Sequence, residues 1–85
     1  MIKLEYTVKN PEGLDARLAG MLVKEAAKCS GRVTVCKEGR TGDAMSIFNL
    51  LALSVKAKEQ IEIIVEGGDE EIEAMVLEAF IKENL

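Results

Sequence analysis

The residues with the clearest chemical potential stand where two helices are expected to begin. The stretch "NPEGLDARLAG" (Asn10 to Gly20) reads as a turn that leads into a helix, with Asp15 at the junction. The stretch "MSIFNLLALS" places Ser46 before a second, shorter helical segment. The first amides of a helix lack intrahelical partners, so they bind capping oxygens and phosphate groups alike. A carboxylate can accept a phosphoryl group as an acyl phosphate, and a serine hydroxyl can become phosphoserine.

Asp15 has three interpretations, and the sequence leaves all of them open. It can be an N-cap, because aspartate is among the residues preferred at that position. It can accept a phosphoryl group, with Arg17 contacting the phosphate oxygens. It can also be a fixed charge that a partner protein reads. In that role it would mimic phosphorylation in part, because a carboxylate carries −1 and a phosphate group about −1.5 to −2.

Ser46 has two interpretations. Its hydroxyl can serve only as the N-cap of the short helix that follows. It can instead be a phosphorylation site, since a phosphate group there would meet free amides and the positive end of the helix dipole. Phosphorylation at this position is expected to add charge without unfolding the domain.

The residues that are missing exclude several kinds of chemistry. The chain has no histidine, which excludes histidine-based catalysis, histidine metal ligands and a phosphohistidine. The two cysteines, Cys29 and Cys36, cannot complete a zinc site alone and are interpreted as reduced thiols of the core. No paired carboxylates at a catalytic spacing and no phosphate-cradling glycine loop are present. We therefore predict no enzymatic activity, no metal and no cofactor.

Length and charge limit the remaining possibilities. The 85 residues predict one domain spanning 1–85. The net charge of −4 and the pI of about 4.8 argue against a nucleic-acid partner, which needs clustered basic residues. No segment approaches the ~20 apolar residues that span a bilayer, and the N-terminus alternates charged and apolar residues. These features predict a cytoplasmic protein without membrane insertion.

Hydrophobic periodicity then predicts the elements that position Asp15 and Ser46. Alternation of apolar and polar residues predicts strands at 2–9, 32–37, 40–42 and 60–67. Glu38 and Gly39 are expected to form a tight hairpin turn. A first helix is expected from Ala16 until Gly31, which would end it with a positive φ, and a short helix at about 46–53. A C-terminal helix is expected after Asp69, with Asp69 as its cap. Its expected core stripe is Ile72, Met75, Val76, Ala79 and Phe80.

The order β-α-β-β-α-β-α predicts the fold class. Strands with one polar face are typical of a mainly antiparallel sheet that is open to water on one side. The three helices must then cover the other side. We predict an α+β fold, an open-faced two-layer sandwich of four strands and three helices of the split β-α-β type.

The short helix carries more apolar residues than two turns can bury on one face. They are Ile47, Phe48, Leu50, Leu51 and Leu53. We expect some of them to be exposed together with Leu18 and Met21 of the first helix, although all of them can also belong to the core. An exposed apolar patch of this kind marks a protein partner or self-association. The sequence is therefore compatible with a monomer or a weak dimer.

Three motifs together resemble the HPr family, the small phosphocarriers of the bacterial sugar phosphotransferase system. They are "NPEGLDAR", "SIFNLLAL" and "EGGDEE", and the resemblance covers essentially the whole chain. Family phosphocarriers have a phosphoacceptor histidine where this chain has Asp15, and usually a proline where it has Leu18. A regulatory branch of the family, typified by the catabolite-repression protein Crh, also lacks the histidine. That branch acts through a serine at the position of Ser46.

The resemblance implies a regulatory protein that works through protein–protein contacts and is switched by phosphorylation of Ser46. The implied partners are an HPr kinase/phosphorylase and a catabolite-control transcription factor. Met45, Asn49 and Ser54 depart from the family pattern around the serine, where the kinase reads its target. The partner-binding residues carried over from the family are Asp15, Ala16, Arg17, Leu18, Gly20, Met21, Ile47, Phe48 and Leu51.

Two rival functions are compatible with the same residues. The first is a phosphocarrier that receives phosphoryl groups from phosphoenolpyruvate through enzyme I and holds them as an aspartyl phosphate on Asp15. The second is an interaction module that keeps the fold without any phosphorylation.

Overall fold

The computed structural model describes all 85 residues and contains the seven elements in the expected order. The elements are β1 (Ile2–Thr7), α1 (Ala16–Ala27), β2 (Arg32–Lys37), β3 (Arg40–Asp43), α2 (Ile47–Ala52), β4 (Gln60–Glu66) and α3 (Glu70–Asn84). The predicted ranges therefore agree closely with the observed ones. None of the helices is long and apolar enough to cross a membrane.

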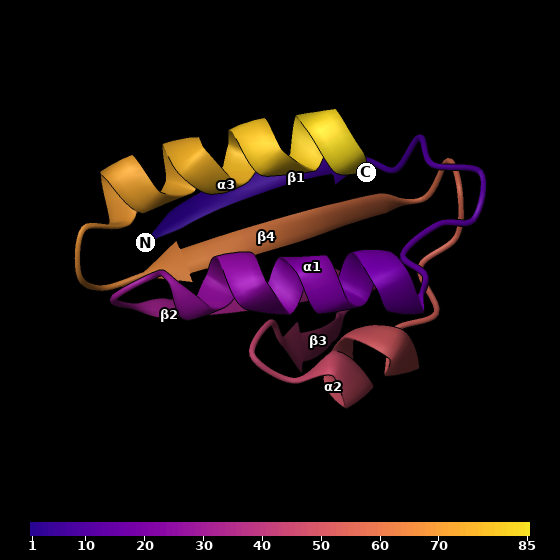
Figure 1. The fold of residues 1–85 in the computed structure, drawn as a ribbon, viewed down its shortest axis with the longest axis horizontal. Coiled ribbons are helices and arrows are strands. Elements are labelled where there is room, and N and C mark those ends of the chain that lie inside the picture. Colours follow the sequence, from indigo (N-terminus) through magenta and orange to yellow (C-terminus); the bar gives the residue numbers. More distant parts are fainter.

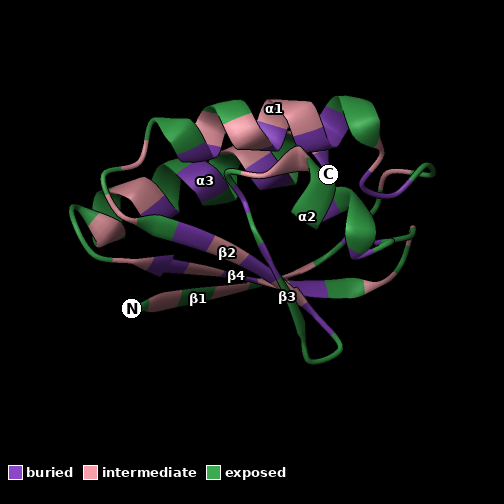
Figure 2. Cartoon of the chain, turned by 90° about the horizontal axis from the view of Figure 1, so that it is seen from below, coloured by how far each residue is buried: buried purple, intermediate pink, exposed green.

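The four strands form one antiparallel sheet in the order β1-β4-β2-β3. The three helices lie on one face of this sheet, and the other face is open (Figures 1 and 2). α3 packs against β1 and β4, whereas α2 lies at the opposite edge beside β3 (Figure 1). The predicted open-faced two-layer sandwich is confirmed.

The alternation predicted for the strands is also confirmed. In β4 the side chains of Ile61, Ile63 and Val65 are buried under the helices, and the residues between them point to the open face. The turn between β2 and β3 consists of Glu38 and Gly39, which both have positive φ. That geometry is the one favoured for a two-residue hairpin loop.

A cluster of 19 buried apolar residues forms the core between the sheet and the helices. α1 contributes Leu18, Ala19, Leu22 and Ala26 to it, whereas α2 contributes only Leu50. Since α2 has six residues and a helix this short is not stable alone, its position depends on these tertiary contacts.

The core stripe expected for α3 is wrong. Its buried residues are Ala74, Leu77 and Ile81. From the expected stripe only Phe80 packs partly against the core, and the side chains of Ile72, Met75, Val76 and Ala79 are exposed. Both sets repeat at spacings of three and four, so periodicity alone could not say which face meets the sheet.

Two expectations about helix ends are also corrected. α1 ends at Ala27 with Lys28 as its C-cap, and Gly31 does not have positive φ. Gly31 instead allows two backbone segments to pack closely, because a Cβ on it would lie 2.0 Å from the carbonyl oxygen of Glu66. Asp69 occupies the N-cap position of α3, but its side chain makes no capping hydrogen bond.

Candidate functional site

Asp15 caps α1, as one of its three interpretations predicts. Its backbone is extended, and its Oδ1 atom accepts a hydrogen bond of 2.9 Å from the amide of Leu18. The preceding loop holds it in place, since the amide of Leu14 donates to the carbonyl of Val55 at 3.0 Å. Gly13 has a φ of +66°, and a Cβ there would lie 2.2 Å from that same carbonyl oxygen. The glycine therefore lets the loop approach closely enough to fix Asp15.

The start of α1 keeps free hydrogen-bonding capacity. The amides of Ala16 and Arg17 have no partner within the chain, and both residues are exposed. The guanidinium group of Arg17 forms no ion pair and lies 3.5 Å from the Sδ atom of Met21. An anionic group of a partner can therefore meet two amides and an uncompensated cation here.

Ser46 caps α2 in the same way. Its Oγ atom accepts a hydrogen bond of 3.2 Å from the amide of Asn49, and its side chain is half-buried. The amides of Ile47 and Phe48 have no partner within the chain. A phosphate group on Ser46 would meet these amides at the positive end of the helix.

The two caps do not form one centre. A Cβ on Gly20 would lie 3.9 Å from the Cδ1 atom of Ile47, so the start of α2 lies beside the middle of α1. Gly20 is about 7.5 Å along the helix axis from Asp15, at 1.5 Å per residue. No hydrogen bond joins Asp15 to Ser46. They are separate sites on neighbouring helices.

An apolar patch lies on α2 and the neighbouring part of α1. We call it the α2 patch. It comprises Met45, Ile47, Phe48, Leu51 and Met21. Some of the residues that were predicted to be exposed there are exposed, and others are half-buried. Phe48 is 83% exposed and Leu51 37%, whereas Ile47 and Met21 are half-buried.

The expectation of an exposed Leu18 is wrong, because that side chain is 1% exposed. It points into the core with Leu22, one helical turn later, so it cannot offer its side chain to a partner. Leu50 and Leu53 are buried as well.

Two basic residues that the sequence analysis did not single out hold α2 in place. The side chain of Lys37 is 6% exposed. Its ammonium group donates to the carbonyl of Ser54 at 2.7 Å and pairs with Glu59 at 2.8 Å. Arg40 donates to the carbonyls of Ala52 and Leu53. Arg40 thus satisfies the carbonyls of the last residue of α2 and of its C-cap, and Lys37 satisfies the carbonyl of the residue that follows.

The pattern of β2 already contained a signal for Lys37. Val33, Val35 and Lys37 alternate along the strand, so they share its buried face. An ammonium group on a buried face needs hydrogen-bond acceptors and a counter-charge. Lys37 finds them at the carbonyl of Ser54 and at Glu59.

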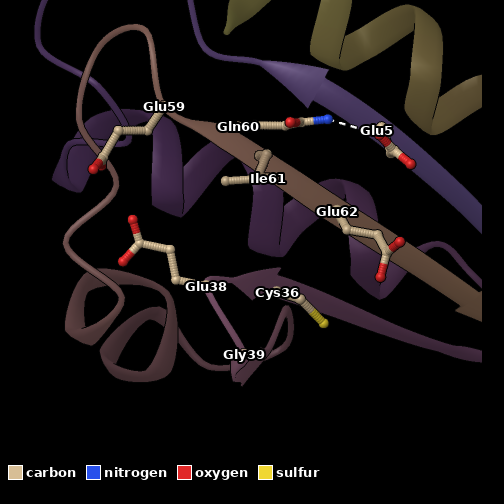
Figure 3. Close-up of a pocket in the computed structure, with 8 residues that line it drawn as sticks. All are labelled: Glu5, Cys36, Glu38, Gly39, Glu59, Gln60, Ile61 and Glu62. Atoms are coloured by element: carbon tan, nitrogen blue, oxygen red, sulfur yellow. Dashed lines mark hydrogen bonds between the residues drawn. The ribbon is translucent and has the colours of Figure 1, made fainter.

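The largest hollow of the molecule is elsewhere, and it is acidic. It lies between the open sheet face and the β2–β3 turn and contains neither Asp15 nor Ser46 (Figure 3). Glu5, Glu62 and Cys36 line it from three neighbouring strands. Burial raises the pKa of the Cys36 thiol and the nearby Glu62 carboxylate raises it further, so the thiolate nucleophile is disfavoured. Nor is any group of three or more Cys, Asp or Glu side chains arranged to hold a metal ion.

Comparisons with known proteins agree with this geometry. A family model described as the PTS HPr component phosphorylation site matches residues 2–83. The HPr-like protein Crh of Halalkalibacterium halodurans is 34% identical over 82 residues, which cover 96% of this chain and 98% of that protein.

Two crystal structures match the fold. HPr-C-His from Thermoanaerobacter tengcongensis has a TM-score of 0.91 at 31% identity, covering 98% of this chain and 93% of that one. Crh from Bacillus subtilis, described as a swapped, intertwined dimer, has a TM-score of 0.77 at 30% identity, covering 100% of this chain and 98% of that one. Since the family model spans nearly the whole sequence and both structures share the fold, the chain belongs to the HPr family.

Proposed function

We propose that this chain is a regulatory member of the HPr family that acts by protein–protein contact and is switched by phosphorylation of Ser46. The observation that carries the proposal is the position of Ser46. Its half-buried hydroxyl stands at the start of α2, beside two free amides and next to the α2 patch. A phosphate group there adds about −1.5 to −2 charge at the edge of an apolar surface without entering the core.

Asp15 acts in this proposal as a fixed charge and not as a phosphoryl acceptor. Its Oδ1 atom accepts the capping hydrogen bond from Leu18, which stabilises the bare carboxylate at the start of α1. Arg17 stands two residues further on without an ion pair. A partner would therefore meet a carboxylate and an unpaired guanidinium group within the first turn of α1.

The partner surface follows from these positions. Exposed Ala16, Arg17, Phe48 and Leu51 would make direct contact, and half-buried Gly20 would let the partner approach the helix backbone. We propose an HPr kinase/phosphorylase and a catabolite-control transcription factor as partners, as the similarity to Crh suggests. An arginine-lined pocket on the transcription factor would bind the phosphoserine. Self-association of this chain into a weak dimer stays a prediction. The Crh protein of Bacillus subtilis is described as a dimer.

The test is the intact mass of the purified chain after two separate incubations. One incubation uses HPr kinase with ATP, and the other uses enzyme I with phosphoenolpyruvate. We expect a gain of one phosphate with the kinase, its absence in Ser46→Ala, and no gain with enzyme I. The matched control is Ser54→Ala, which removes an exposed serine just after α2 and should leave the gain intact.

The opposite pattern would support the rival function. A gain only with phosphoenolpyruvate, lost in Asp15→Ala and labile to hydroxylamine, would identify an aspartyl phosphocarrier. No gain in either incubation would leave an interaction module without phosphorylation and would overturn the proposed switch.

A further inference from the structure

The face of α3 that points away from the core is apolar. We call it the α3 stripe and define it as Ile72, Met75, Val76 and Ala79. The side chains of Ile72, Met75 and Val76 are 67%, 71% and 55% exposed. At 3.6 residues per turn, this stripe is centred opposite the buried face formed by Ala74, Leu77 and Ile81.

The stripe is more than scattered exposed apolar residues. Its members follow one another at i, i+3, i+4 and i+7, the spacing by which a helix face docks on another helix. It is also separate from the α2 patch, because α3 covers β1 and β4 whereas α2 lies at the other edge of the sheet (Figure 1). The proposed function above makes no use of this face.

A hollow of about 150 Å³ adjoins the stripe between α3 and the end of α1. Ile72, Val76, Leu77 and Cys29 supply its apolar lining, and the other lining residues are Glu25, Lys28 and Glu73. A cavity of similar volume in another protein admits a benzene ring. The hollow can therefore receive one apolar side chain from a partner helix whose neighbouring side chains cover the stripe.

The charges around the stripe decide which partner fits. Glu71 and Glu78 flank one side, and Glu83 follows at the end of the helix. Lys82 pairs with Glu78 at 3.9 Å and Lys28 pairs with Glu25 at 3.3 Å, so Glu71 is the flanking carboxylate without an ion pair. A second copy of this chain would bring acidic flanks against acidic flanks, which is unfavourable.

We propose that the α3 stripe docks an amphipathic helix of a partner protein with an apolar face and basic flanks. Its apolar side chains cover Ile72, Met75 and Val76, and one of them enters the hollow. One of its lysines or arginines faces Glu71, and another competes with Lys82 for Glu78, so binding weakens as salt concentration rises. This contact is independent of Ser46 and of the α2 patch.

The test uses the full chain and a labelled synthetic peptide of about 18 residues, long enough to form a helix. The peptide carries leucines at helical spacing with lysine flanks, and affinity is measured by fluorescence anisotropy. We expect Met75→Gln to weaken binding at least about tenfold, which is about 1.4 kcal/mol. The matched control Phe48→Gln removes an exposed side chain of the α2 patch and should leave the affinity unchanged.

Charge is tested with Glu71→Gln/Glu78→Gln, which should weaken binding and flatten its salt dependence. Amide shifts in nuclear magnetic resonance should map to α3 and the end of α1. Equal binding to Met75→Gln, equal binding of a peptide with glutamate flanks, or shifts centred on α2 would overturn the proposal. So would a dimer in sedimentation that Met75→Gln dissociates, because the occupant would then be a second copy.

Discussion

At the scale of single residues, Asp15 combines a structural task with a charge. The capping hydrogen bond to Leu18 stabilises α1, and the charge is available to a partner. Asparagine ranks with aspartate as an N-cap, whereas alanine offers no acceptor. The two tasks can therefore be separated by substitution.

We predict that Asp15→Ala lowers the free energy of unfolding by about 1 kcal/mol, within ~0.5–2 kcal/mol. Asp15→Asn should lose only a few tenths of a kcal/mol, because its side-chain oxygen still accepts from the Leu18 amide. Urea denaturation followed by circular dichroism measures both. Glu12→Ala is the control, since Glu12 is an exposed residue of the same loop without a capping bond. A loss in Asp15→Asn equal to that in Asp15→Ala would mean that charge, and not capping, stabilises the helix.

At the scale of elements, close backbone contacts decide where strands and helices can lie. β2 begins next to Gly31, where the backbone approaches Glu66 at the end of β4. Gly20 is the contrasting case, because it lies inside α1 and a Cβ there would only touch Ile47 at 3.9 Å. Packing therefore requires a glycine at position 31 but not at position 20.

We predict opposite effects for the same substitution at these two positions. Gly31→Ala should destabilise the fold by about 1–3 kcal/mol, because its Cβ would overlap backbone that cannot move freely. Gly20→Ala should stabilise it by about 0.5–1 kcal/mol, since alanine loses less entropy than glycine in a helix. Thermal melting should show Tm changes of opposite sign, about 4–8 °C per kcal/mol in a domain of this size. A lower Tm for Gly20→Ala would contradict the conclusion that a Cβ fits beside Ile47 at that position.

At the scale of the whole molecule, ion pairs link parts of the chain that are distant in sequence. Lys37 hydrogen-bonds Glu59 across the loop before β4, and this bond and the amide of Lys56 hold the pKa of that carboxyl below its usual range. The N-terminal ammonium group bonds Glu70 at 2.6 Å, which together with the amide of Gly67 also lowers the pKa of that carboxyl. Both carboxylates therefore stabilise the folded state only while they are ionised.

The pH dependence of stability follows from these pKa directions. A lowered folded-state pKa gives stability that is complete above the ordinary carboxyl pKa of about 4.3, and it is lost as the pH falls through the lowered value. On the alkaline side, burial raises the pKa of Cys29 and Cys36. That contribution is complete below the ordinary thiol pKa of about 8.5 and is lost as the pH rises through the raised value.

We predict that urea midpoints fall below about pH 4.3 and again above about pH 8.5. Glu59→Gln should flatten the acid decrease and leave the alkaline one unchanged. Cys36→Ala should flatten the alkaline decrease and leave the acid one unchanged. Each variant therefore serves as the control for the other. An acid decrease as steep in Glu59→Gln as in the parent chain would rule out Glu59 as one of its causes.

The sequence by itself determined most features that depend on local physics, although the roles expected of Gly31 and Asp69 at helix ends were wrong. Strand alternation, the two capping residues Asp15 and Ser46 and the hairpin at Glu38 and Gly39 were all predictable, because each depends on a few neighbouring residues. Element order then limited the topology to an open sheet with helices on one face. The three motifs also sufficed to indicate the HPr family.

Only the tertiary structure decided which of two competing faces is buried. α3 carries apolar residues on opposite sides, and its contact with β1 and β4 buries Leu77 while leaving Met75 in solvent. In α1 the same effect turns Leu18 inward. The alternation of β2 indicated the buried face of Lys37, but its partner Glu59 was decided only by the tertiary structure. Periodicity gives the spacing of a stripe, but its phase depends on the surface against which it packs, and that surface comes from strands distant in sequence.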